Sequence, residues 1–155
     1  MDRIRRFKPE VMDTEGMPIG VFHFDYFADN PAIALIARRG SGKSEICKAI
    51  IKHFYKIPIG IIICPSEHVD PFYGKFFPDT FIYKEYQTSI IMQLYKRQER
   101  IKGKRDKYAL VGKRVDTRGL ILMDDCMADS SSWKKDKLLR DLLMNGRHKD
   151  VMYIV

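Results

Sequence analysis

A glycine-rich turn between an apolar run and an amphipathic segment constrains this chain more than any other feature. Gly40 and Gly42 lie in the turn, and Lys43 and Ser44 follow it. Glycines at such positions let the backbone wrap closely around an anion, so that successive N–H groups point inward. The start of the following helix adds the positive end of its dipole. The pattern predicts a strand, a phosphate-binding loop and a helix within residues 33–55.

The residues of this loop have expected roles in binding a nucleoside triphosphate and Mg²⁺. Lys43 is expected to reach the β- and γ-phosphate oxygens, and the Ser44 hydroxyl to take one position around Mg²⁺. The residues expected to bind nucleotide are Arg39, Gly40, Ser41, Gly42, Lys43, Ser44 and Glu45. The consensus of such loops is Gly-x-x-x-x-Gly-Lys-Ser/Thr. Ala37 stands at the position of its first glycine, which we interpret as a mild departure. A chance match in a flexible loop is the alternative, and the flanking strand and helix disfavour it.

Length and cysteine usage limit the class of protein. A chain of 155 residues is long enough for one domain with a core and short for two. The three cysteines are widely spaced inside apolar runs, which indicates buried thiols in a reducing compartment rather than disulfides or a zinc site. No signal peptide follows Met1, and the longest apolar run, 57–64, is too short to span a bilayer. We therefore expect no membrane insertion.

Apolar runs alternate with amphipathic segments, which predicts an α/β fold with a mainly parallel sheet in three layers. Strands are expected at 33–37, 59–64, 81–83, 119–125 and 151–155, and helices at 43–55, 88–102 and 133–144. We expect residues 1–29 to form an N-terminal arm with an edge strand over 18–27, and residues 30–155 to form the core. Because the sequence stops inside an apolar strand, we interpret this core as truncated at its C-terminus.

The expected boundaries of the last helix follow from capping residues. Serines at 130–132 offer N-caps for the helix over 133–144. Asn145 and Gly146 are expected to end it in a left-handed turn.

Two adjacent acids follow the apolar run at 119–123. Asp124 is expected to hold Mg²⁺ together with Ser44, and Asp125 to act as the general base that polarises the attacking water. An apolar strand that ends in two acids is common by itself as a strand-to-loop junction. A phosphate loop about 80 residues earlier in an α/β pattern favours the metal role.

Positive charge is concentrated in one segment of a chain whose net charge is +8. Residues 95–118 hold ten lysines and arginines against three acids, a net charge of +7. This concentration suggests a polyanion partner such as DNA or RNA, and a solvated helix face is the alternative. We expect a helix to about residue 102 and an exposed basic loop over 103–118. Arg147 is expected near the site. It is a candidate arginine finger, which would stabilise charge on the γ-phosphate bound by a neighbouring subunit; the alternative is a cation that favours the C-terminal end of a helix dipole.

Four stretches resemble the DNA-packaging ATPase of large nucleocytoplasmic DNA viruses. This is the poxvirus-type packaging ATPase, within the FtsK–HerA superfamily of P-loop NTPases. The stretches are Gly-Ser-Gly-Lys-Ser (40–44), Leu-Ile-Leu-Met-Asp-Asp-Cys-Met (120–127), Trp-Lys-Lys-Asp-Lys (133–137) and Leu-Met-Asn-Gly-Arg-His (143–148). The resemblance covers about residues 30–155, and the last three stretches are more specific than the phosphate loop.

The resemblance implies a RecA-like ATPase core that uses ATP and Mg²⁺. It also implies a homo-oligomeric ring that translocates double-stranded viral DNA into capsids, with capsid or portal components as partners. The implied location is the viral factory of the host cytoplasm and the virion. A family member carries a glutamine sensor just after the strand that starts at Val151, and this sequence stops before that position. The alternatives are a P-loop kinase of a small acceptor, with 103–118 as its lid, and a non-catalytic nucleotide-binding subunit.

Overall fold

Five parallel strands form the main sheet of the protein, in the order β3-β7-β6-β4-β5. The computed structural model describes residues 9–12, 18–20, 22–38, 40–126 and 133–155. The strands are β3 (Ala32–Ile33), β4 (Gly60–Ile63), β5 (Ile82–Tyr83), β6 (Gly119–Met123) and β7 (Val151–Ile154). The predicted α/β class and parallel sheet are confirmed.

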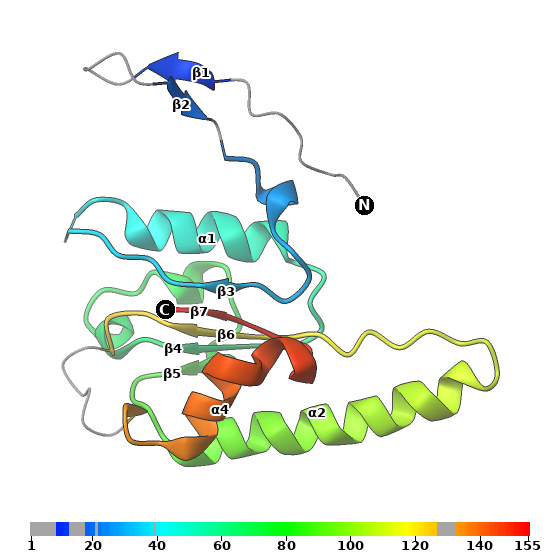
Figure 1. The fold of residues 1–155 in the computed structure, drawn as a ribbon. Coiled ribbons are helices and arrows are strands. Elements are labelled where there is room, and N and C mark those ends of the chain that lie inside the picture. The colour runs from blue at the N-terminus through cyan, green and yellow to red at the C-terminus, as the bar shows by residue number, and fades with distance from the viewer. Residues whose placement is uncertain (1–8, 13–17, 21, 39, 127–132) are drawn as a thin grey trace.

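Helices cover both faces of this sheet (Figure 1). One face carries α1 (Lys43–His53), and the other carries α2 (Thr88–Ala109) and α4 (Lys137–Asn145). Every residue of β6 is buried, as expected for a central strand covered on both sides. Alternate residues enter the two cores: Ile121 packs on the side of α2 and α4, and Leu122 packs on the side of α1.

The N-terminal segment differs from the edge strand expected over residues 18–27. β2 (Pro18–Gly20) pairs antiparallel with β1 (Pro9–Met12) in a separate two-stranded sheet. Beyond it the chain turns in a short 3₁₀ helix, Phe24–Tyr26. The aromatic residues there fold back instead of extending: the ring of Phe24 stacks on that of Phe27, and both pack against the core beside α1. Local aromatic packing therefore replaces the alternating pattern of an edge strand.

α2 is longer than predicted. It continues to Ala109, so the first seven residues of the expected basic loop are helical, and only residues 110–118 lie outside regular structure. Lysine and arginine have high helix propensity, and they outweigh the cost of Gly103. Helical spacing predicts that Ile91, Leu94, Tyr95 and Gln98 share one face of this helix. Ile91, Leu94 and Gln98 are buried, and Tyr95 is half-buried and packs against the same core.

α4 begins later and ends differently from the prediction. Its N-cap is Asp136, whose carboxylate accepts the N–H groups of Leu138 (2.7 Å) and Leu139 (3.3 Å). The serines at 130–132 lie outside the described residues. Gly146 is right-handed and starts a 3₁₀ turn, Gly146–Lys149, and the left-handed residue is Asp150. A Cβ at position 146 would lie 2.9 Å from the Val151 oxygen, so glycine serves a close approach there.

A membrane-spanning helix needs both sufficient length and an apolar composition. Within the ranges described above, no helix has both the length and the apolar composition needed to cross a membrane.

Candidate functional site

The carboxyl edge of the sheet brings together the glycine turn and the acidic pair. The turn connects β3 to α1, and Asp124 directly follows β6. Lys43 Nζ lies 2.8 Å from Asp124 Oδ1, and the Ser44 hydroxyl donates a 3.0 Å hydrogen bond to Asp124 Oδ2. Parallel strands end at one edge, so residues 80 positions apart meet here. The structure thus places Lys43, Ser44 and Asp124 in direct contact.

The glycine turn has the backbone that its sequence predicts. Gly40 (φ +73°) and Gly42 (φ +87°) are both left-handed, and Gly42 is the N-cap of α1. A hollow of about 480 Å³ opens beside them, and it is lined by Ala37, Arg38, Gly40, Gly42, Lys43, Ser44, Glu45 and Asp125. The turn therefore offers free space next to the N-terminus of α1.

Ser41 and Glu45, both assigned to nucleotide binding, make contacts within the glycine turn and α1. The Ser41 hydroxyl donates a 2.7 Å hydrogen bond to the Arg38 carbonyl, which closes the turn on itself. Glu45 lines the hollow and pairs with Lys48 at 3.5 Å. Arg39 lies outside the described residues.

Only the first part of the expected strand 33–37 is paired. After β3, the Leu35 N–H donates a 2.6 Å hydrogen bond to the Val155 carbonyl, and the next residue, Ile36, is 98% exposed. Ala37 and Arg38 lead from there to the glycine turn and line the hollow beside it.

Asp124 is a buried carboxylate with a full set of donors. It is 4% exposed, and Oδ2 accepts hydrogen bonds from the hydroxyls of Ser44 and Tyr73 (2.7 Å), while Oδ1 faces Lys43. Burial raises the pKa of Asp124, but hydrogen bonds from Lys43 and Tyr73 and the charge of Lys43 outweigh it and hold the pKa below its ordinary value. The same contact raises the pKa of Lys43. Asp124 is therefore ionised at neutral pH and can bind a cation.

Tyr73 is a site residue that the sequence analysis missed. Its side chain is 1% exposed, and its backbone is fixed by Glu67, whose carboxylate accepts the N–H groups of Phe72 (3.0 Å), Tyr73 (3.0 Å) and Gly74 (2.8 Å). Tyr73 lies in residues 66–78, a stretch rich in proline, glycine and aromatic residues that predicts an ordered loop. No spacing pattern in the sequence connects this loop to Asp124, so only the tertiary structure reveals the contact.

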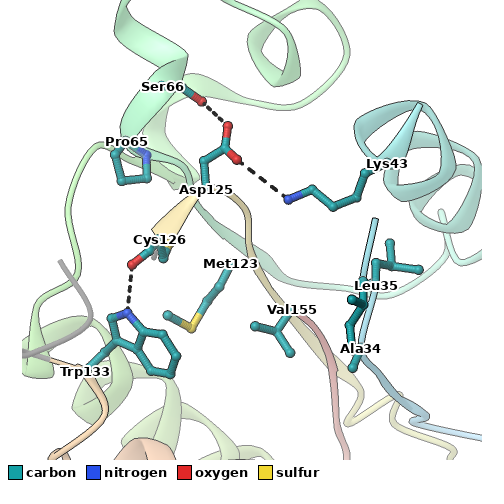
Figure 2. Close-up of a pocket in the computed structure, with 11 residues that line it drawn as sticks. Ala34, Leu35, Lys43, Pro65, Ser66, Met123, Asp125, Cys126, Trp133 and Val155 are labelled. Atoms are coloured by element: carbon teal, nitrogen blue, oxygen red, sulfur yellow. Dashed lines mark hydrogen bonds and ion pairs between the residues drawn. The ribbon is translucent and has the colours of Figure 1, made fainter. Parts of the chain in front are cut away.

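Asp125 occupies a more open position than Asp124. Its side chain is 60% exposed and its backbone is left-handed (φ +55°). One carboxylate oxygen accepts a 3.1 Å hydrogen bond from the Ser66 hydroxyl, and the other lies 3.6 Å from Lys43 Nζ (Figure 2). Asp125 thus lies at the solvent side of the same cluster, held by Ser66 at the end of β4. Ser66 is a second residue that the sequence analysis missed.

A second, more apolar cavity of about 610 Å³ adjoins the cluster (Figure 2). Lys43 and Asp125 line both this cavity and the hollow at the glycine turn. Its other walls include Met123, Trp133 and Val155, and the Trp133 indole N–H donates a 2.9 Å hydrogen bond to the Cys126 carbonyl. The two spaces meet at Lys43 and Asp125, so a ligand on the glycine turn would end beside an apolar chamber.

Arg147 is not near this cluster, which corrects the sequence-based expectation. It belongs to the 3₁₀ turn that leads into β7, and it therefore lies at the amino edge of the sheet (Figure 1). Lys43 and Asp124 lie at the carboxyl edge. The error arose because α4 runs back across the sheet between the two edges, so its C-terminus is remote from the site. Arg147 cannot act on a ligand bound at the glycine turn of its own subunit.

The donor set fits magnesium better than a softer metal. Among the described residues, no cluster of three or more histidine, cysteine or acidic side chains could hold a metal ion by itself. Asp124 and Ser44 supply a carboxylate and a hydroxyl, which is the small oxygen set that Mg²⁺ uses when phosphate oxygens and waters complete its shell. The residues present therefore fit a Mg²⁺ ion that arrives with a phosphate ligand.

Comparison with known proteins connects the chain to large DNA viruses. It is 35% identical over 134 residues to an uncharacterized protein of Acanthamoeba polyphaga mimivirus, covering 86% of this chain and 47% of that protein. Similar matches are uncharacterized proteins of Frog virus 3 (34% identity; 79% of this chain, 36% of the relative) and Invertebrate iridescent virus 6 (33%; 79% and 45%). The chain thus spans less than half the length of each of these relatives.

Two other comparisons gave no match. No protein-family model matches the chain, and no solved structure is significantly similar to it.

Proposed function

We propose that the chain is the nucleotide-binding core of an ATP-hydrolysing motor that translocates double-stranded viral DNA into capsids. The observation that carries the proposal is the contact of Ser44 and Lys43 with the buried carboxylate of Asp124 at the end of a central strand. A glycine turn with free space, a helix N-terminus and an oxygen pair suited to Mg²⁺ are what a nucleoside triphosphate requires. The parallel sheet is compatible with a RecA-like sandwich.

The residues of the cluster divide the work of hydrolysis. Lys43 would contact the β- and γ-phosphate oxygens in place of Asp124, and Ser44 and Asp124 would hold Mg²⁺, which would neutralise phosphate charge. Asp125, more open and oriented by Ser66, accepts a proton from the attacking water. The adjoining cavity gives that water a place beside Asp125.

The viral relatives support the packaging role. The matched proteins come from large DNA viruses, as the resemblance to the poxvirus-type packaging ATPase of the FtsK–HerA superfamily leads one to expect. We extend the proposal to a homo-oligomeric ring, to capsid or portal partners, and to action in the viral factory of the host cytoplasm and in the virion. In such a ring Arg147 serves only a neighbouring subunit, because it is remote from its own site.

The kinase alternative is weaker than the motor in this structure. It required residues 103–118 as a lid over the phosphates, but this segment leads into the amino end of β6, at the edge of the sheet away from Lys43. A non-catalytic nucleotide-binding subunit remains the second candidate, because Lys43 is engaged by Asp124 in this state.

ATPase assays with and without duplex DNA test the proposal. We expect ATP turnover that duplex DNA stimulates, loss of turnover in Lys43→Ala, and ATP binding without turnover in Asp125→Asn. An exposed lysine on the same helix, changed in Lys52→Ala, is the matched control and should leave turnover unchanged. Phosphate transfer to a small acceptor would support a kinase, and nucleotide binding without turnover in the unmodified chain would support the non-catalytic subunit.

A further inference from the structure

α2 carries a row of positive side chains along its solvent face. Lys96, Arg100, Lys104 and Lys107 follow one another at intervals of four, four and three residues, which places them on one side of a helix. All four are exposed. At 1.5 Å per residue the row is about 16 Å long. We call these four residues the α2 stripe.

The stripe faces away from the residues that attach α2 to the protein. The buried residues of α2 are Ile90, Ile91, Leu94 and Gln98, and none follows Gln98. Figure 1 shows the second half of the helix running past the edge of the sheet. Because no residue of α2 after Gln98 is buried, this part of the helix is not stabilised by a buried core, which is the usual source of helix stability.

The stripe residues have no internal partners, unlike the cations on the neighbouring face. Across the described ranges, no hydrogen bond or ion pair joins a stripe side chain to another residue. By contrast, Lys102 and Arg105 lie 3.7 and 3.6 Å from the carboxylate of Asp150, and Lys102 also donates to the His148 carbonyl. One face of the helix thus fixes it to the amino edge of the sheet, and the other presents free charge.

A row of unpaired like charges is unfavourable for an isolated helix. Each like-charge pair at i,i+4 destabilises a helix. A linear polyanion that covers the row would remove this repulsion. The buried apolar residues of α2 pack against the sheet and are not available for insertion into a membrane surface; Met92 and Tyr108 are exposed on the same helix.

We propose that the α2 stripe binds the phosphate backbone of duplex DNA. Four lysine and arginine side chains in a straight row of about 16 Å complement the regular line of phosphates along a duplex, and such contacts carry no base information. The proposal takes duplex DNA as partner from the proposed function and assigns it to a surface. That surface is separate from the nucleotide cluster, so we expect it to bind DNA in the absence of nucleotide.

The test compares two variants of equal charge. The stripe variant changes Lys96, Arg100, Lys104 and Lys107 to Gln, which has a similar helix propensity. The control variant changes four exposed lysines elsewhere to Gln: Lys52, Lys56, Lys75 and Lys84. Circular dichroism checks that both fold. Affinity for a 30-base-pair duplex of random sequence is then measured without nucleotide between 50 and 200 mM salt.

We expect the stripe variant to bind at least tenfold more weakly than the control variant at 100 mM salt. The slope of log affinity against log salt should also become shallower by about 2–4 in the stripe variant, because each lost phosphate contact removes about 0.9. Equal losses in the two variants would overturn the assignment. If the affinity for duplex DNA depends on the stripe but the protein does not turn over ATP, the assignment of the stripe stands and the proposed motor is overturned.

Anionic vesicles are the second probe, because Leu110 and Val111 are exposed just beyond α2. We expect vesicles of phosphatidylserine and phosphatidylcholine to bind the stripe variant and the control variant equally, because the two carry the same charge. Stripe-dependent binding to vesicles, with none to duplex DNA, would replace nucleic acid by a membrane surface as the partner.

Discussion

The Tyr73 hydroxyl donates a 2.7 Å hydrogen bond to Asp124 Oδ2, the same oxygen that accepts the Ser44 hydroxyl. Both side chains of this pair are buried. Glu67 fixes the backbone of Tyr73 through three N–H groups, so the hydroxyl is delivered from a rigid loop. Burial, with the hydrogen bond to Asp124, raises the pKa of Tyr73 well above its ordinary value, so the hydroxyl stays a donor. Tyr73 therefore acts as a positioning residue for the proposed magnesium carboxylate.

Replacing Tyr73 by Phe removes this hydrogen bond and keeps the ring. A hydrogen bond to a buried charged group contributes about 1.5–3 kcal/mol, so the free energy of unfolding should fall by about that amount. The Mg²⁺ concentration needed for half-maximal ATP binding should rise, because Asp124 is less constrained. Urea denaturation and Mg²⁺ titration measure the two effects. Tyr55→Phe, at an exposed position, is the control; a Tyr73→Phe protein that matches it in both assays contradicts the positioning role.

The stability of the protein should fall in acid through Asp124. Its folded pKa is below the unfolded value of about 3.9, so the unfolded chain binds more protons between these two values. The contribution is therefore present above about pH 4–5 and is lost as the pH falls through the folded pKa. Urea midpoints between pH 7 and 3 should decline less steeply in Asp124→Asn than in the unmodified protein.

An exposed carboxylate provides the control for this pH series. The Asp70 side chain has neither an ion pair nor a hydrogen bond within the described ranges. Asp70→Asn should reproduce the acid decline of the unmodified protein. If the urea midpoint of Asp124→Asn falls with pH as steeply as that of Asp70→Asn, the pKa of Asp124 is not lowered by folding.

Replacing Gly42 or Gly103 by alanine should change the free energy of unfolding in opposite directions. Gly42 is left-handed and open to solvent, so a methyl group meets no atom but strains the backbone by about 1–2 kcal/mol. Gly103 lies within α2 with open space around it, so alanine should stabilise the protein by about 0.5–1 kcal/mol. Thermal or urea unfolding of both variants measures the difference. The same sign in both variants contradicts the backbone description.

The three cysteines should resist alkylation in the folded protein. All are buried and free; burial is the main cause that raises the pKa of Cys47 to about 11 and of Cys126 to about 12. At pH 8 the reactive thiolate is therefore scarce. Iodoacetamide should modify none of them within the time that labels all three in urea. Rapid labelling of Cys47 without urea would show that the core beside Asp124 is open.

Local sequence patterns predicted the elements that depend on local chemistry. Continuous apolar runs identified β4 and β6, and helical spacing identified the buried face of α2 at Ile91, Leu94 and Gln98. The glycine turn was also predictable, because the left-handed backbone at positions 40 and 42 favours glycine over other residues. These features need no knowledge of distant contacts.

Features that depend on tertiary contacts were not predictable. The position of Arg147 follows from the direction in which α4 crosses the sheet, and the contact of Tyr73 with Asp124 follows from a loop fixed by Glu67. α4 ends at Asn145, and the 3₁₀ turn that follows brings Gly146 close to the Val151 carbonyl, a contact that no capping rule contains. Each error therefore has a specific contact as its cause.

The central claim is that the glycine turn and Asp124 form one site for ATP with Mg²⁺. The most direct measurement is the gain in ATP affinity that Mg²⁺ produces, measured by calorimetry with Mg²⁺ and with EDTA. The variants are Ser44→Ala, Asp124→Asn and the double variant, and Ser41→Ala, whose hydroxyl closes the turn instead, is the control. If Ser44 and Asp124 share one ion, each single variant loses most of the gain, the double variant loses no more, and the control keeps it. Losses that add in the double variant, or a gain that survives in Asp124→Asn, would contradict a shared magnesium ion.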